Sequence, residues 1–153
     1  MSAFEEELNE ALTTTFRCVL KVEELAIKHY SDVKLTISET HIIEMIGKNE
    51  KENITVSGLA SELGITLPSV TVAVNKLEKK GYVNKVKSEE DARRVHIELT
   101  RKGKKIFTAH NFFHLKMVKN ISGEFSKDEK ETLLSAIIKL NRFFNEKIRK
   151  LEL

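Results

Sequence analysis

The stretch LASELGITLPSVTVAVNKL, residues 59–77, has the length and punctuation of a helix-turn-helix. Gly64 stands where the first helix needs a left-handed C-terminal cap, and Thr66 restarts a helix almost immediately. Pro68 falls in the first turn of this second helix, where its missing N–H would have had no partner within the helix. Thr55 is positioned to cap the first helix, so the stretch predicts two short helices joined by a tight turn.

A β-hairpin is predicted directly after these helices. Residues 82–87 have the composition of a strand, and residues 88–92 form a polar, acidic turn. Val95, Ile97 and Leu99 then alternate with polar residues, as in a second strand with one buried face. A helix-turn-helix followed at once by a hairpin is a winged helix.

Two more helices are predicted upstream. Thr36 and Glu39 have the spacing of a capping box, and they open a helix that Gly47 is expected to close. Before it, apolar side chains recur at near-helical spacing, so a long first helix has one apolar face over about seven turns. That face consists of Phe4, Leu8, Leu12, Phe16, Val19, Ile27 and Tyr30.

Two long helices are predicted at the C-terminal end. Thr100 caps the first, which Gly123 ends, and Ser126 with Glu129 forms a second capping box. The last helix carries an apolar stripe made of Leu133, Ile137, Leu140, Phe144, Ile148 and Leu151. A monomer could not bury such stripes, so the fold class is mainly α with a small β-wing, dimerising through its terminal helices. We expect a helical dimerisation region at 1–35 plus 104–153, and a winged helix-turn-helix DNA-binding region at 36–103.

The net charge of +3 is unevenly distributed. Residues 1–65 hold 6 Lys/Arg against 12 Asp/Glu, and residues 66–75 hold no charged side chain. Residues 76–105 hold 11 Lys/Arg against 5 Asp/Glu, and residues 106–153 hold 9 against 6. A basic block on the end of the second helix, the wing and the start of the next helix is typical of a face that binds nucleic acid, or alternatively of a solvated charged surface.

Composition excludes several classes of protein. The 153 residues are 41% hydrophobic and 32% charged, which indicates a soluble globular chain and excludes a collagen-like or disordered one. The acidic start MSAFEEELNE and the lack of a long apolar run argue against a secretory leader or membrane span, and the lone Cys18 favours a reducing cytoplasm. There is no glycine-rich phosphate loop, nucleophile elbow or dinucleotide fingerprint, so the chain is not expected to be an enzyme.

The motifs together resemble the MarR family of winged-helix transcription regulators over nearly the whole chain. The resemblance is carried by Leu59-Ala60, Leu63-Gly64, Val70, Leu77-Glu78-x-x-Gly81, Asp91-x-Arg93 and Leu99-Thr100-x-x-Gly103. Within the family, four stretches are most similar to the subgroup that represses bacterial fatty-acid biosynthesis. These are ETHIIEMIGK, TLPSVTVAVNKLEKKGYVNKVKSEED, RRVHIELTRKG and FFHLKMV.

The resemblance implies a homodimer that places two recognition helices in successive major grooves of a pseudo-palindromic operator, about 34–36 Å apart. Hydroxyls and Asn can read base edges, Val72 can touch a thymine methyl, and lysines suit phosphates. Val72 stands where many family members have a long polar or basic residue, which puts guanine reading there in doubt. The expected DNA-binding residues are Thr66, Pro68, Ser69, Thr71, Val72, Asn75, Lys76, Lys79, Arg93 and Arg94.

Some of these residues have alternative roles. Ser69 and Thr71 lie close to the helix start, so they are alternatively a cap and a surface residue. By resemblance Arg93 enters the narrow minor groove from the wing, and Asp91 orients it through an ion pair. Arg94 is alternatively a solvated strand residue or a phosphate contact.

The fatty-acid resemblance implies an acyl-chain effector, carried on acyl carrier protein as co-repressor. An apolar slot would be lined by Phe16, Leu20, Ile42, Met45, Phe113 and Met117, which are alternatively ordinary core residues. The carrier is acidic, so Lys102, Lys104 and Lys105, or the basic residues of the wing, are candidates to receive it.

The histidines indicate an alternative function within the same family, that of a metal-responsive regulator. His110 and His114 have the spacing of two metal ligands on one helix face. Zinc-sensing repressors in the family use a comparable set of histidines and acidic residues, which here would be Glu24, Glu39, His41, His110 and His114. The stretch HYSDV lacks the cysteine associated with those sensors, and the histidines are alternatively packed or hydrogen-bonded at the helix junction. The alternative functions are therefore a zinc-responsive repressor and a repressor that responds to small phenolic compounds or drugs; no cofactor is required otherwise.

Overall fold

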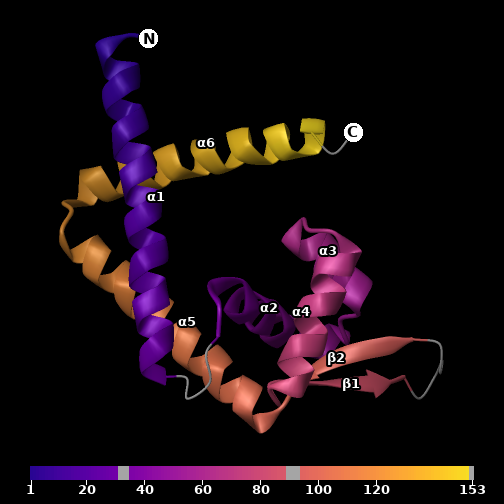
Figure 1. The fold of residues 1–153 in the computed structure, drawn as a ribbon. Helices are drawn as coiled ribbons and strands as arrows, with labels where there is room; N and C mark the ends of the chain where they lie inside the picture. Colours follow the sequence, from indigo (N-terminus) through magenta and orange to yellow (C-terminus); the bar gives the residue numbers. More distant parts are fainter. Residues whose placement is uncertain (31–34, 89–93, 152–153) are drawn as a thin grey trace. The chain divides into compact units, whose positions relative to one another are not determined.

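The computed structural model describes residues 1–30, 35–88 and 94–151. Within these residues, six α-helices and one two-stranded sheet follow the predicted order, which confirms a winged helix-turn-helix flanked by long helices (Figure 1). A short 3-10 helix lies where the sequence predicts only a polar loop. The elements are α1 (Ala3–Tyr30), α2 (Ile37–Lys48), η1 (Glu50–Glu52), α3 (Val56–Leu63), α4 (Leu67–Lys79), β1 (Val83–Lys87), β2 (Val95–Leu99), α5 (Arg101–Gly123) and α6 (Lys127–Leu151).

The chain forms two compact units. Residues Met1–Phe113 hold α1 to α4, the hairpin and the first half of α5, and residues His114–Leu153 hold the rest of α5 and α6. The first unit has one hydrophobic core beneath the helix-turn-helix. Its buried members are Ile42, Ile43, Ile46, Ile54, Leu59, Ala60, Val70, Val74, Leu77, Tyr82, Val83, Ile97, Leu99 and Ile106.

The helix starts are capped as the sequence predicts. Thr36 and Glu39 form both hydrogen bonds of the capping box at the start of α2. The Thr55 hydroxyl accepts the Gly58 N–H at 3.1 Å, and the Thr66 hydroxyl caps α4 in the same way. Gly64 ends α3 with φ of 62°, a left-handed conformation that glycine adopts without steric cost. These local signals place α3 and α4 as a helix-turn-helix.

The wing is a regular antiparallel hairpin. Val83 pairs with Leu99 at its base and Lys87 with Val95 toward its tip. The Ile97 N–H donates to the Ile54 carbonyl at 2.8 Å, which ties β2 to the loop before α3. The predicted turn at 88–92 lies outside the described residues except for Ser88, whose N–H donates to the Arg94 carbonyl at 2.9 Å.

Gly47 was predicted to close α2, but the helix continues to Lys48. A Cβ on Gly47 would lie 2.6 Å from the Phe107 ring. Close packing against α5, rather than helix termination, therefore explains the glycine. The prediction was wrong because a glycine near a helix end resembles a cap in the sequence, whereas its packing neighbour is 60 residues away in the chain.

The last helix, α6, also begins as predicted. Ser126 and Glu129 form a capping box at the start of α6, and α5 ends at Gly123. Across the residues that the structure describes, no single helix has the length and apolar character to cross a membrane. α3 and α4 meet that test only as a pair, bent by 117°, on length and composition alone.

Candidate functional site

One face of α4 is exposed along its whole length. Val70, Val74 and Leu77 are buried against the core, and this turns the opposite residues outward. Seven of the predicted DNA-binding side chains are exposed there and Asn75 is half-buried; the exposed ones are Thr66, Pro68, Ser69, Thr71, Val72, Lys76 and Lys79. The structure therefore places all the predicted residues of this helix and its cap on one surface.

The first residues of that surface also make local hydrogen bonds. The hydroxyls of Thr66 and Ser69 lie 2.8 Å apart, and the Thr71 hydroxyl donates to the Leu67 carbonyl at 2.8 Å. Ser69 belongs to the N-terminal cap that Thr66 provides, whereas the Thr71 hydroxyl bonds back to the preceding helical turn from the surface of α4. Both contacts are local, as in the alternative roles predicted for these two residues. They orient the hydroxyls without removing their remaining capacity to bond DNA.

Asn75 is held by a residue of the wing that the sequence did not single out. The Lys85 ammonium on β1 donates to Asn75 Oδ1 and forms an ion pair with Glu78 at 3.1 Å. This contact uses the carbonyl oxygen of the Asn75 amide, and the amide NH₂ is the group that can donate to a base edge. Lys85 was missed because no local motif links β1 to α4, although both elements lie in the basic block.

The wing itself is described only in part. Arg94 is exposed at the start of β2, as expected of a residue that solvent or a phosphate could reach. Asp91 and Arg93, the predicted orienting residue and minor-groove reader, lie outside the described residues. Their roles remain predictions.

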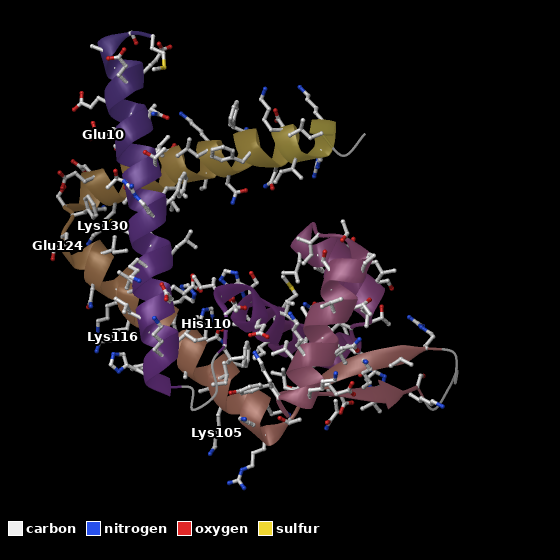
Figure 2. The ribbon with its side chains drawn as sticks, viewed as in Figure 1. Glu10, Lys105, His110, Lys116, Glu124 and Lys130 are labelled. Atoms are coloured by element: carbon white, nitrogen blue, oxygen red, sulfur yellow. The ribbon has the colours of Figure 1, made fainter. Side chains whose placement is uncertain are left out.

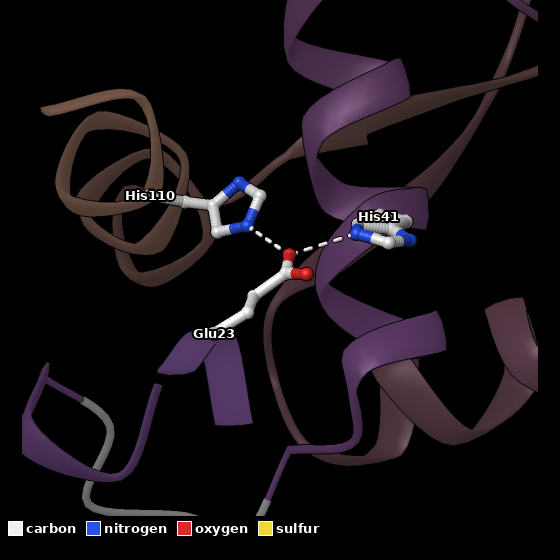
Figure 3. Close-up of side chains that lie close together, drawn as sticks. All are labelled: Glu23, His41 and His110. Carbon is white, nitrogen blue, oxygen red and sulfur yellow. Dashed lines mark hydrogen bonds and ion pairs between the residues drawn. The ribbon is translucent and has the colours of Figure 1, made fainter. Parts of the chain in front are cut away.

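A buried carboxylate joins two histidines inside the first unit. Glu23 Oε1 on α1 lies 2.8 Å from His41 Nε2 on α2 and 2.7 Å from His110 Nε2 on α5 (Figure 3). Glu23 is 3% exposed and His110 is fully buried. Burial raises the pKa of Glu23, but the hydrogen bonds and charges of His110 and His41 outweigh it, so the pKa lies below its ordinary value. The carboxylate is thus kept ionised at a junction of three helices.

Comparison with known proteins supports the winged-helix interpretation. Residues 25–109 match the family profile "Transcriptional regulator SarA/Rot". The chain is 33% identical to the transcriptional regulator AdcR of Streptococcus pyogenes, over 66% of this chain and 69% of AdcR. Its structure superposes on FabT of Streptococcus pneumoniae in complex with DNA with a TM-score of 0.88 and 37% identity, covering 93% of this chain and 98% of FabT.

This chain is a winged-helix transcription regulator of the MarR and SarA type. The regulator YhjH of Bacillus subtilis is 26% identical over 85% of this chain and 71% of its own. A MarR family regulator, SP03579, has the same fold with a TM-score of 0.78 at 19% identity. These relatives are DNA-binding regulators rather than enzymes, and the regulator described here is one as well.

The structure regroups the predicted metal ligands. Among the described residues of the first unit, His41 and His110 of that set lie together around Glu23. Glu24 points elsewhere and pairs with Lys21 and Lys28, which lower its pKa to about 2. Glu39 belongs to the capping box, and His114 lies in the second unit.

Glu23 could have been found from the spacing of α1. Val19, Glu23 and Ile27 are four residues apart, so Glu23 lies on the same helix face as the buried Ile27. Glu24 is rotated by about 100° from that face, which is the turn per residue of an α-helix. The position of Glu23 on the apolar face of α1 was therefore a better indication of a buried carboxylate than residue type, which does not distinguish Glu23 from Glu24.

The predicted effector-lining residues are dispersed. Phe16 and Leu20 are about half exposed on α1, whereas Ile42 is 2% exposed in the core. Met45 and Phe113 are half-buried in the first unit, and Met117 belongs to the second. Leu20 lines a groove of about 600 Å³ on α1 together with Ile37 from the start of α2.

The basic residues at the start of α5 have separate contacts. Lys102 lies over the Tyr82 ring, 4.3 Å from its centre, and Lys104 pairs with Glu50. Lys105 is exposed on the same half of α5 that carries His110 (Figure 2). Arg101, Lys104 and Lys105 border a shallow groove of about 560 Å³ that continues to the exposed Phe112.

Proposed function

We propose that this regulator is a homodimeric repressor of fatty-acid biosynthesis genes that responds to an acyl chain carried on acyl carrier protein. The observation that carries the proposal is the 37% identity and TM-score of 0.88 to DNA-bound FabT over 93% of the chain. The four stretches that resemble the fatty-acid repressor subgroup support the same assignment. A chromosomal operator as target would place the regulator in the cytoplasm.

DNA reading is assigned to α4 and the wing. Ser69, Thr71 and Asn75 offer hydroxyl and amide groups to base edges, and Lys76 and Lys79 offer charge to phosphates. The exposed Val72 would contact a thymine methyl. Arg93 would enter the adjacent minor groove, where A·T-rich sequence strengthens the negative potential.

Dimerisation is assigned to the helical region at 1–35 plus 104–153. Much of α1 is apolar and exposed, including Phe4, Phe16 and Leu20. None of the residues of α6 is buried within the described chain, although the helix carries Ile137, Phe144 and Ile148 on one stripe. Exposed apolar faces of this extent are typical of an interface with a second copy.

The effector contacts are assigned to the first unit. The groove beside Leu20 and Ile37 is a candidate slot for part of an acyl chain. The basic groove at Arg101, Lys104 and Lys105 has the charge that an acidic carrier protein requires. An acyl chain could regulate DNA binding only if it bound more tightly to a dimer with one distance between its two α4 helices than to a dimer with another distance.

The test is operator binding with and without the effector. Fluorescence anisotropy would measure binding to duplexes taken from upstream of the fatty-acid synthesis genes of the same genome, with an unrelated promoter as control. We expect tighter binding when long-chain acyl carrier protein is present and no change with the unacylated carrier. Equal affinity for all promoters, or no response to the acylated carrier, would reject the assignment.

A second candidate function rests on Glu23, His41 and His110. Their possible ligand atoms lie within 4.8 Å of one another, and nitrogen and carboxylate ligands suit Zn²⁺. Elemental analysis of the purified protein before and after chelation, followed by operator binding with added Zn²⁺, tests a zinc-responsive repressor. Stoichiometric zinc that His41→Ala abolishes would favour this function over acyl sensing.

A further inference from the structure

A partly buried ion pair, with Glu39 buried and Lys80 28% exposed, joins the start of α2 to the end of α4. Both oxygens of Glu39 accept hydrogen bonds from Lys80 Nζ, at 2.7 and 2.8 Å. Glu39 is 6% exposed, and Lys80 is the residue that directly follows α4. The two residues are 41 positions apart in sequence, so the contact is tertiary rather than local.

Glu39 serves two structures at once. One of its oxygens also accepts the Thr36 N–H at 2.9 Å, which completes the capping box of α2. Burial raises the pKa of Glu39, but the hydrogen bonds from Lys80 and Thr36 and the charge of Lys80 outweigh this effect. The pKa of Glu39 therefore lies below its ordinary value, and the carboxylate is ionised at neutral pH. The first turn of α2 is thus fixed to the last turn of α4 through one carboxylate.

The turn after α4 is also attached to α5. The Thr100 hydroxyl donates to the Gly81 carbonyl at 2.7 Å, and Lys102 Nζ donates to the Lys80 carbonyl at 3.2 Å. The end of the recognition helix, α4, is therefore held by α2 through a side-chain ion pair and by Thr100 and Lys102, at and just before the start of α5, through backbone carbonyls. Lys85 of β1 adds a third attachment through Glu78. Of these attachments, only the ion pair connects α4 to the helix that also carries His41.

A buried ion pair contributes little net stability, because desolvation of both charges offsets most of their attraction. The Glu39 side has a strict geometric requirement, since a carboxylate that is 6% exposed is costly to leave without a partner, whereas Lys80 can still reach water. Such a pair favours one arrangement of the two helices over neighbouring ones. A shift of α4 by a fraction of its width would move Asn75, Lys76 and Lys79 together relative to DNA.

We propose that Glu39 and Lys80 are a positioning pair for DNA reading, which fixes α4 on α2 and thereby sets the affinity for specific DNA. Neither residue belongs to the exposed face of α4 that is expected to contact bases. The proposal rests on the DNA-binding function of the regulator and is independent of the fatty-acid assignment.

Glu39→Gln separates positioning from electrostatics and from helix capping. Glutamine at this position can still accept the Thr36 N–H, so the capping box is retained. The substitution removes one negative charge, which raises the net charge by one unit, and electrostatics alone would therefore tighten binding to any DNA. Loss of positioning has the opposite sign, because specific binding weakens.

The experiment uses a labelled duplex selected by the wild-type protein from a random library, and an unrelated duplex of the same length. We expect Glu39→Gln to weaken binding to the selected duplex about tenfold and to leave binding to the unrelated duplex equal or tighter. Glu62→Gln, an exposed substitution on α3 with the same change in charge, is the matched control and should retain selective binding. Circular dichroism melts establish that each variant is folded at the assay temperature.

Lys80 supplies the second arm of the test. Lys80→Met should lose selective binding and Lys80→Arg should retain most of it, because arginine keeps a cation against the carboxylate. In the double variant of Glu39→Gln and Lys80→Met, the loss should be smaller than the product of the two single losses. Unchanged or tighter binding of Glu39→Gln to the selected duplex would overturn the proposal, as would equal losses on both duplexes.

Discussion

Gly103 lies where α5 crosses the turn that follows the recognition helix. A Cβ at this position would overlap the carbonyl oxygen of Tyr82, which also accepts the Thr100 N–H at 3.0 Å. We predict that Gly103→Ala lowers the free energy of unfolding by about 1–3 kcal/mol, the usual cost of forcing an extra carbon into a packed site. Urea denaturation followed by circular dichroism measures this change.

Gly123 provides the control for that substitution. It ends the same helix, and a Cβ there would have no neighbour within 4 Å. Gly123→Ala should therefore be neutral, or stabilising by up to about 1 kcal/mol through the lower entropy of the unfolded chain. If both variants lost stability equally, the close approach of Gly103 to Tyr82 would not be the cause.

Lys76 has the position of a phosphate contact on the exposed face of α4. We predict that Lys76→Ala weakens binding to selected and unrelated duplexes by similar factors, because a phosphate carries no base sequence. The slope of log affinity against log salt should fall by about one unit. Titrations at four salt concentrations measure this slope. A loss confined to the selected duplex would instead assign Lys76 to base reading.

At the scale of helices, the Glu39–Lys80 pair should make the free energy of unfolding depend on pH in the acid range. The pKa of Glu39 in the folded protein lies below 4.5, its ordinary value, so folding favours the ionised carboxylate. The stability that this group contributes is complete above about pH 4.5 and is lost as pH falls toward the folded pKa. We predict that the unfolding free energy of Glu39→Gln declines less steeply than that of the wild type between about pH 5 and pH 3.

Urea denaturation at closely spaced pH values measures the difference. Glu23 also has a lowered pKa, but it is present in both proteins, so its contribution cancels in the comparison. Parallel pH profiles for the two proteins would mean that the Glu39 carboxylate is not stabilised by Lys80 and Thr36 in solution.

Elements with local signals were predictable, and contacts between elements were not. Thr36, Thr55 and Thr66 each cap a helix within three residues, so their roles follow from short-range spacing. The pairing of Glu39 with Lys80 depends on how α2 and α4 pack, which no local pattern contains. The sequence therefore suggested Glu39 as a metal ligand, whereas the structure assigns its oxygens to Lys80 and Thr36.

The same limit applies to the two candidate sites. The exposed face of α4 was predictable because the buried side chains repeat at helical spacing and leave one face outward. The histidine cluster was only half predictable: His41 and His110 were identified, but the carboxylate between them is Glu23 rather than Glu24. A rotation of one residue along α1 decides which carboxylate faces inward, and the buried Ile27 is the residue that fixes this rotation.

At the scale of the whole molecule, the exposed apolar stripe of α6 is the surface to which the proposed homodimer interface is assigned. Ile137, Phe144 and Ile148 are each between 44% and 52% exposed. A monomer of 17.5 kDa would leave these apolar side chains in contact with water. Burial of apolar surface contributes about 25 cal/mol per Å², which would favour association through such a stripe. In the proposed homodimer, tight operator binding depends on dimerisation, since two linked DNA-binding regions bind a palindrome far more tightly than one.

We predict that Ile137→Glu converts the regulator from a dimer to a monomer, because a carboxylate in the interface would be buried without a counter-charge. Sedimentation equilibrium should give the mass of one chain, 17.5 kDa, in place of twice that value. Affinity for a two-half-site duplex should fall by about 10²-fold or more, while affinity for a single half-site stays unchanged. Thr132→Glu, an exposed position away from the stripe on the same helix, is the control and should remain dimeric. A variant Ile137→Glu that remains a dimer, or that binds both duplexes as the wild type does, would assign dimerisation to surfaces other than α6.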